Sequence, residues 1–399
     1  MGNVLKNNGN NTFPCTSGVF SNMTHQIEIW IPLVSGLVSM SLVWLGSRLS
    51  SIMLRSDLSA VQASHTRETL RFGGLGIAVA LVLMVATRGP EAKVLFLMLG
   101  ASVPVFLSGL LEDIGIYQSP RRRLAAAVLS SLLAIWLLEA HLPHIGISYL
   151  DAVFAIFAFA AAFTIVSTVG VIHAFNLIDG LNGLAGITAV AACASFLVIA
   201  NLAGAPEVGL VASTLLAAML GFLAVNYPYG RIFLGDAGAY LVGFMLVWIA
   251  VKLLHQTGTV APWSMALVLF WPIADTLLAI IRRRAKRQKV THPDRMHFHH
   301  VVMRGIEIAL LGRRDRRISN PLATAILAPF VVMPPITAVL LWNSPTEALL
   351  ATVGFGLLFA TTYVLTVRAL KTGRLRRKRA GFGSFPTASK PLTNQTFEH

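Results

Sequence analysis

The chain has 399 residues, of which 55% are hydrophobic and only 12% charged, and its mean hydropathy is +0.70. This composition excludes an ordinary water-soluble domain. The formal net charge of +15 would also suit a nucleic-acid-binding protein, so the positions of the 32 lysines and arginines are decisive.

Apolar stretches follow one another along most of the chain. A bilayer-spanning helix needs roughly 20 mostly apolar residues, and about eleven stretches approach or reach that length. They are 27–47, 72–87, 93–111, 124–140, 151–170, 184–203, 208–225, 238–254, 261–281, 320–342 and 346–367. We therefore predict an all-α, polytopic membrane protein. Its single transmembrane domain (27–367) lies between a polar outer leader (1–26) and a basic cytoplasmic tail (368–399).

Basic residues alternate from one connection to the next. Five connections, 48–71, 112–123, 226–237, 282–319 and 368–399, hold 28 of the 32 lysines and arginines. Because basic loops stay in the cytoplasm, we expect the N-terminus outside and the C-terminus inside. The basic tail then suits anionic lipid head groups, and we expect no nucleic-acid binding.

Acidic residues gather at the predicted inner ends of the spans. Glu112 and Asp113 close the third span, and their mutual repulsion would be relieved by a divalent cation. A solvated span end is the alternative. Within the spans, Asp275 is the one clear ionisable residue, about 10 Å from the cytoplasmic end.

Two further segments combine glycines with polar side chains. Asn176, Asp179 and Asn182 lie between the fifth and sixth spans, where a tight turn with Asn182 as a helix cap is the alternative. Asp236 opens the eighth span, either as a cap or as a carboxylate that holds Mg²⁺ against a phosphate at the helix N-terminus.

A histidine-rich run lies in the most basic connection. His297, His299 and His300 follow Arg295 closely, and imidazolium and guanidinium groups both donate to phosphate oxygens. The alternatives for this run are a structural zinc site and a solvated segment without a ligand. A fifth polar stretch, 65–76, contains Arg71 and several glycines that suit either a ligand or close helix packing.

At these residues the sequence resembles the polyprenyl-phosphate N-acetylhexosamine-1-phosphate transferases, over about residues 48–305. The 176–184, 233–238 and 293–300 segments carry this resemblance. It implies transfer of an N-acetylhexosamine 1-phosphate from a UDP-sugar to undecaprenyl phosphate at the cytoplasmic face of a bacterial inner membrane. UMP is released and a cell-surface glycan begins.

The resemblance also implies a site. It implies that Asp236 and Asp113 bind the metal ion, which is Mg²⁺ or, as an alternative, Mn²⁺. The implied catalytic residues are Glu112, Asp113, Asp179, Arg295, His297, His299 and His300, and the implied substrate-binding residues are Arg71, Asn176, Asn182, Asn226 and Phe233. Asp275 in Pro272–Thr276 resembles the O-antigen-initiating branch more than the peptidoglycan branch.

Two residues depart from the family pattern. Glu112 replaces the first of two common aspartates, and Asn182 replaces an acidic residue often found three positions after Asp179. Alternative functions are a multi-span transporter or lipid flippase, which predicts polar residues at the bilayer midplane, and a lipid-phosphate phosphatase. A homodimer is left open.

Overall fold

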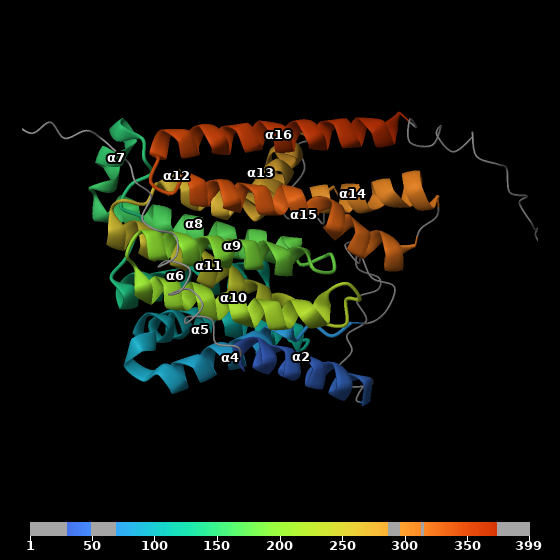
Figure 1. Ribbon diagram of the computed structural model, residues 1–399, viewed down its shortest axis with the longest axis horizontal. Helices are drawn as coiled ribbons and strands as arrows, with labels where there is room; N and C mark the ends of the chain where they lie inside the picture. Colours follow the sequence, from blue (N-terminus) through green and yellow to red (C-terminus); the bar gives the residue numbers. More distant parts are fainter. Residues whose placement is uncertain (1–29, 49–68, 286–295, 313–314, 373–399) are drawn as a thin grey trace, which may run out of the picture.

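The computed structural model describes residues 30–48, 69–285, 296–312 and 315–372. In this part of the chain the structure is helical, and the isolated β-bridge between Leu70 and Ile232 is parallel. Most of the long helices lie side by side along one common direction (Figure 1). The predicted leader 1–26, most of the basic tail and Arg295 lie outside the described residues.

The helices follow the predicted order of apolar stretches. The first half contains α2 (Trp30–Arg48), α4 (Gly73–Arg88), α5 (Lys93–Asp113), α6 (Pro120–Leu138), α7 (Ser148–Phe154), α8 (Phe157–Ile178) and α9 (Leu184–Leu202). The second half contains α10 (Pro206–Asn226), α11 (Gly235–Thr257), α12 (Pro262–Val268), α13 (Phe270–Ala285), α14 (Phe298–Ile306), α15 (Arg316–Leu340) and α16 (Pro345–Lys371).

Two predicted spans differ from the helices observed. The predicted span 151–170 is replaced by the short α7 and by α8, which continues to Ile178, because apolar and small residues extend beyond the predicted end. The predicted span 261–281 breaks at Leu269, where α12 and α13 meet at 82°. The break turns α13 and its terminal arginines away from the direction of α12.

Helices α4 and α5 form an antiparallel pair joined by a short 3₁₀ turn, Gly89–Ala92. Gly74 near the start of α4 and Gly109 near the end of α5 both pack against the first turn of α11. The glycines of α4 therefore serve close helix packing. The sequence had left two roles open for them, a ligand contact or close helix packing. At 16 residues, about 24 Å, α4 is short for a bilayer.

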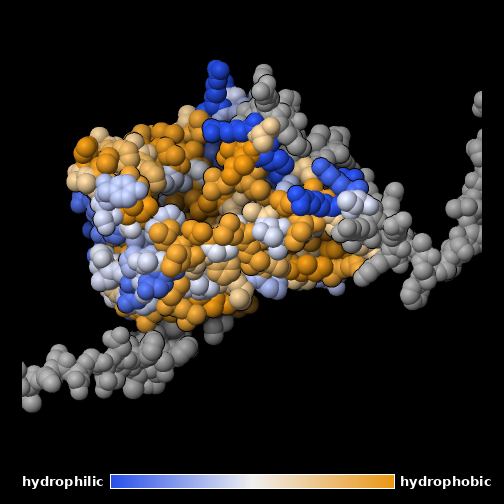
Figure 2. Space-filling view, turned by 90° about the horizontal axis from the view of Figure 1, so that it is seen from above, coloured by the Kyte–Doolittle hydropathy of each residue, from blue (hydrophilic) through white to orange (hydrophobic). Residues whose placement is uncertain are grey.

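Helix α11 is the centre of the bundle, and it packs against α4, α5, α8, α9 and α10. Nearly all of its side chains are buried. The outer helices instead expose large apolar side chains such as Trp136, Val166 and Leu357. Figure 2 shows the resulting broad hydrophobic surface, on which hydrophilic residues form only local patches. Such a surface needs lipid or another apolar environment.

Seven described helical segments are long and apolar enough to cross a membrane, or eight if α12 and α13 form one span. The protein is therefore a multi-span membrane protein. The count is below eleven partly because α4 and α5 are joined as one segment, Gly73–Asp113, and because Arg121, Arg122 and Arg123 lower the hydropathy of α6. The predicted eleven spans and their orientation stay predictions.

Candidate active site

The site is built around the first turn of α11. The chain before α4 pairs with the chain before α11: the Phe233 amide donates to the Leu70 carbonyl at 2.9 Å, and the Gly73 amide donates to the Phe233 carbonyl at 2.8 Å. This pairing brings Arg71 to Gly235. Gly235 has φ of +73°, and a Cβ there would collide with the Arg71 carbonyl, so only glycine permits this approach.

Asp113 of α5 caps α11. Its two carboxylate oxygens accept hydrogen bonds from the backbone amides of Asp236 and Ala237, each at 2.9 Å. The first amides of a helix have no partner within the helix, and its N-terminus favours negative charge. Asp113, and not Asp236, therefore fills the capping role, which leaves the Asp236 side chain available for other partners.

The Asp236 side chain is almost buried, at 8% exposure, among three polar side chains. The Asn176 amide nitrogen donates to its Oδ1 at 3.1 Å. Arg71 lies 3.5 Å from Oδ1, and Arg123 lies 3.4 Å from Oδ2. These ion pairs are longer than the 2.7–2.9 Å of a tight charge-assisted bond, so the two guanidinium groups surround the carboxylate loosely.

Asp179 directly follows α8 and completes a group of three carboxylates with Asp113 and Asp236. Burial raises the pKa of Asp179 to about 8. Arg71 and a hydrogen bond from the Gly235 backbone lower this pKa, whereas the charges of Asp113 and Asp236 raise it. Three acidic side chains, at the end of α5, just after α8 and in the first turn of α11, therefore influence one another at one end of the bundle.

This donor set fits Mg²⁺, which typically binds one or two carboxylates and takes its other ligands from water and phosphate oxygens. Asp236 would hold the ion together with Asp179 or Asp113. Among the described residues there is no group of three or more His, Cys, Asp or Glu side chains arranged around a metal position.

The histidine run lies against the turn that follows Asp179. A Cβ at Gly180 would be 3.4 Å from Cε1 of His300 and 3.7 Å from Nε2 of His299. The rings of His299 and His300 are 4.2 Å apart between centroids, and those of His297 and His299 are 5.6 Å apart. The start of α14 therefore adds three imidazoles to the same end of the bundle as the carboxylates.

Asn182 and Asn226 connect the two loops beside the carboxylates. The Asn226 side chain accepts from the Gly183 amide at 2.6 Å and donates to the Ile232 carbonyl at 2.6 Å. Asn182 donates to the Pro228 carbonyl at 2.8 Å. Asn182 does not cap α9, since Gly183 precedes that helix without a side-chain cap. Both amides thus support the loops, and their substrate contacts stay predictions.

Glu112 and Phe233 lie at the edges of the site. The Glu112 carboxylate accepts a hydrogen bond from the backbone amide of Gln118 at 2.6 Å, which stabilises the turn between α5 and α6. Phe233 is only 3% exposed. The predicted catalytic role of Glu112 and the predicted nucleotide contact of Phe233 remain predictions.

Three residues of the site were not predicted from the sequence. Arg123 was not among the predicted site residues, yet its side chain lies 3.4 Å from Asp236 Oδ2 and hydrogen-bonds to Tyr240. Tyr240 follows Asp236 by one helical turn, which is the signal that could have identified it. Asp275 was noted only for its depth and its family resemblance, whereas the structure places it beneath the histidines.

Fold and site together define a helical membrane protein with carboxylates, guanidinium groups and imidazoles at one end of its bundle, a combination suited to charged phosphate ligands. Sequence comparison shows a similarity to one family over part of the chain. The model of Glycosyl transferase family 4 matches residues 95–254, a segment that includes Asp113, Asn176, Asp179 and Asp236. Over this segment, which is less than half of its length, the chain is similar to glycosyl transferase family 4.

Three relatives that match part of the chain have similar names. An undecaprenyl-phosphate alpha-N-acetylglucosaminyl 1-phosphate transferase of Escherichia coli strain K12 is 30% identical over 149 residues, 35% of this chain and 40% of the relative. The Pasteurella multocida protein of the same name is 31% identical over 176 residues, 41% of this chain and 45% of the relative. A probable undecaprenyl-phosphate N-acetylglucosaminyl 1-phosphate transferase of Bacillus subtilis is 34% identical over 89 residues, 22% of this chain and 25% of the relative. The matches thus span less than half the length of these distant homologues.

Proposed function

We propose that the protein transfers an N-acetylhexosamine 1-phosphate from a UDP-sugar to undecaprenyl phosphate and releases UMP. The observation that carries this proposal is the convergence of Asp113, Asp179 and Asp236 with Arg71 and Arg123 within or beside the segment that matches glycosyl transferase family 4. The names of the relatives support the acceptor and the sugar phosphate.

In the proposed reaction, an oxygen of the lipid phosphate attacks the β-phosphorus of the UDP-sugar. The bond from this phosphorus to the bridging oxygen breaks, and UMP leaves with that oxygen. Such phosphoryl transfer requires mainly positioning and charge stabilisation. The products are UMP and a lipid diphosphate sugar, so all atoms are accounted for without a further reactant.

The side chains present suit these tasks. Arg71 and Arg123 already face one carboxylate, and both can donate to phosphate oxygens at the same position. The histidines would donate to the far end of the diphosphate from across the Asp179–Gly180 turn. Mg²⁺, when bound at Asp236, would neutralise charge on the diphosphate.

The proposed setting is the cytoplasmic face of a bacterial inner membrane, where the reaction would begin a cell-surface glycan. The relatives are bacterial proteins. The C-terminal end of α16 and helix α14 lie toward the same end of the bundle in Figure 1, in agreement with the proposed inner C-terminus. The whole predicted domain 27–367 would then form the catalytic unit.

An assay with purified protein, undecaprenyl phosphate, Mg²⁺ and a panel of labelled UDP-N-acetylhexosamines tests the function. We expect stoichiometric formation of UMP and a labelled lipid, and the reverse reaction when UMP is added. A transporter or flippase would form neither product, and a phosphatase would release inorganic phosphate from the lipid without using the UDP-sugar. Either result would overturn the proposal.

A further inference from the structure

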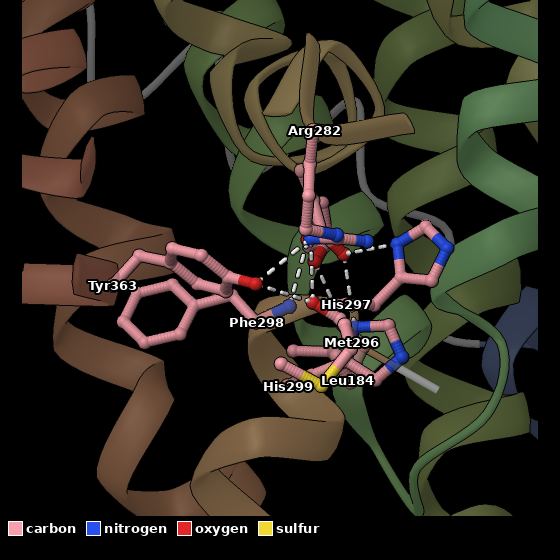
Figure 3. A network of polar contacts seen from close by, with 9 residues as sticks. Leu184, Arg282, Met296, His297, Phe298, His299 and Tyr363 are labelled. Atoms are coloured by element: carbon pink, nitrogen blue, oxygen red, sulfur yellow. Dashed lines mark hydrogen bonds and ion pairs between the residues drawn. The ribbon is translucent and has the colours of Figure 1, made fainter. Parts of the chain in front are cut away.

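Asp275 forms a buried anchor beneath the histidine run. It lies in α13 with 1% exposure. Its Oδ2 is 3.2 Å from Nδ1 of His297 and 3.0 Å from Nδ1 of His299, and its Oδ1 accepts a hydrogen bond from the Phe298 amide at 2.9 Å. One carboxylate thus contacts three consecutive residues at the start of α14, His297, Phe298 and His299, which are labelled in Figure 3.

These contacts determine which ring nitrogen carries a proton. An ionised carboxylate only accepts hydrogen bonds, so Nδ1 of His297 and Nδ1 of His299 must both be donors. The opposite ring nitrogen, Nε2, then points away from Asp275 in each imidazole. The tautomer of both histidines therefore depends on Asp275.

Both Nε2 atoms are buried, and neither has a hydrogen-bond partner among the residues that the structure describes. The two side chains are at most 2% exposed, and their rings are nearly parallel, inclined by 23°. A buried polar atom without a partner is costly and often marks a ligand position. Nε2 of His299 also faces the Gly180 turn beside the carboxylate group.

The chain just before these histidines is held separately. Arg282 donates to the Met296 carbonyl at 2.9 Å, and the Tyr363 hydroxyl donates to the same carbonyl at 3.2 Å (Figure 3). Arg282 also donates to the Tyr363 hydroxyl at 2.9 Å. Arg282 of α13 and Tyr363 of α16 thus hold the backbone at Met296, whereas Asp275 holds the Phe298 amide through Oδ1 and contacts the two rings through Oδ2.

We propose that Asp275 is a positioning residue that orients His297 and His299 and fixes their protons, so that the two Nε2 atoms face the diphosphate of the donor. This proposal rests on the proposed function. A ring that donates through Nε2 while also donating through Nδ1 carries a positive charge, and the carboxylate beneath compensates for that charge. Carboxylates oriented behind functional histidines act similarly elsewhere.

The substitution Asp275→Asn tests the proposal because it keeps the size of the side chain. The amide oxygen can still accept from the Phe298 amide, but the amide nitrogen can only donate and would meet the Nδ1 protons of both rings. We expect kcat/KM for the transfer to fall about 10- to 100-fold. Glu307→Gln, which changes a carboxylate bonded to Ser319 just beyond α14, is the matched control and should retain wild-type transfer.

A double-mutant cycle separates positioning from a merely structural role. In a His297→Asn/His299→Asn background, Asp275→Asn should lower kcat/KM by less than about twofold further, because residues acting through one another are not additive. A further loss as large as that in the wild-type background would overturn the proposal. So would wild-type activity of the single Asp275→Asn variant.

A second measurement does not depend on transfer. In protein labelled with ¹⁵N-histidine and assigned through the two His→Asn variants, the ring signals of His297 and His299 should show protonated Nδ1. Asp275→Asn should move both signals toward the Nε2-protonated form. Unchanged signals would overturn the positioning role, whereas absence of transfer in the wild type alone would overturn only the proposed function.

Discussion

Asp113 and Asp236 are joined by a hydrogen bond in which the backbone of one residue meets the side chain of the other: the Asp236 amide donates to Asp113 Oδ1 at 2.9 Å. This contact ties the end of α5 to the start of α11 across 123 positions of sequence. It also separates the two roles of the aspartates. Asp113 satisfies the helix terminus, while the carboxylate of Asp236 is left to face Asn176 and two arginines.

Asp113→Asn should therefore reduce both stability and transfer. An amide retains one acceptor oxygen, but its NH₂ group would face the Ala237 amide, whose hydrogen bond would be lost. Loss of a helix cap costs about 1 kcal/mol, and we expect a lower Tm in detergent. Transfer should fall more than this stability loss explains, because Asp236 would shift with the first turn of α11. Normal activity at a lower Tm would show that Asp113 only caps the helix.

Mg²⁺ should raise the Tm of the wild-type protein, since an ion that binds only the folded state stabilises it by mass action. Asp236→Asn should abolish this rise and lower transfer at least about 100-fold. The control is Asp151→Asn, which removes a carboxylate bonded to the Ile145 amide in the loop before α7. It should keep the Mg²⁺-dependent rise. An equal rise in both variants would contradict metal binding at Asp236.

The positions of many helices could be predicted from the lengths of the apolar stretches in the sequence. Apolar length predicted the positions of α9, α10, α11 and α16 to within a few residues, because each of these helices is apolar along its whole length and is bounded by polar or turn-forming residues. The break at Leu269 was missed because the apolar run continues through α12 and α13, although Pro272 in the first turn of α13 cannot donate to the Val268 carbonyl and so opposes one continuous helix.

The site was predicted as a set of segments, but its internal contacts were not. Asp113 and Asp236 were expected to share a metal, and the structure brings them together. The partner of the histidines was missed, because Asp275 and His297 are 22 positions apart on different helices and no spacing rule links them. Arg123 was missed for a similar reason, since three adjacent arginines give no signal of which one turns inward.

Close packing of α5 on α11 predicts that Gly109→Ala will be damaging. A Cβ at Gly109 would meet the backbone of Asp236 and Ala237, which cannot move without displacing the first turn of α11. Gly100→Ala on the same helix is the matched control, because nothing lies within 4 Å of its Cβ position. We expect Gly109→Ala to lose roughly 1–3 kcal/mol of stability and most transfer, and Gly100→Ala to lose neither. Equal thermal stability of the two variants would contradict the packing.

The departure at Asn182 has a structural explanation in the Pro228 carbonyl. The Asn182 amide nitrogen donates to this carbonyl at 2.8 Å, whereas the ionised carboxylate of Asn182→Asp would place two acceptors against each other. The variant should therefore be destabilised by about 1–3 kcal/mol, more than Asn182→Ala, which only removes the donor.

A protonated carboxyl can donate, so the stability deficit of Asn182→Asp should shrink as the pH falls through the pKa of the new carboxyl. The deficit of Asn182→Ala should not change with pH, and thermal unfolding of both variants across a pH series measures the difference. An Asn182→Asp variant as stable as the wild type at neutral pH would mean that the Pro228 contact does not determine the choice of asparagine here.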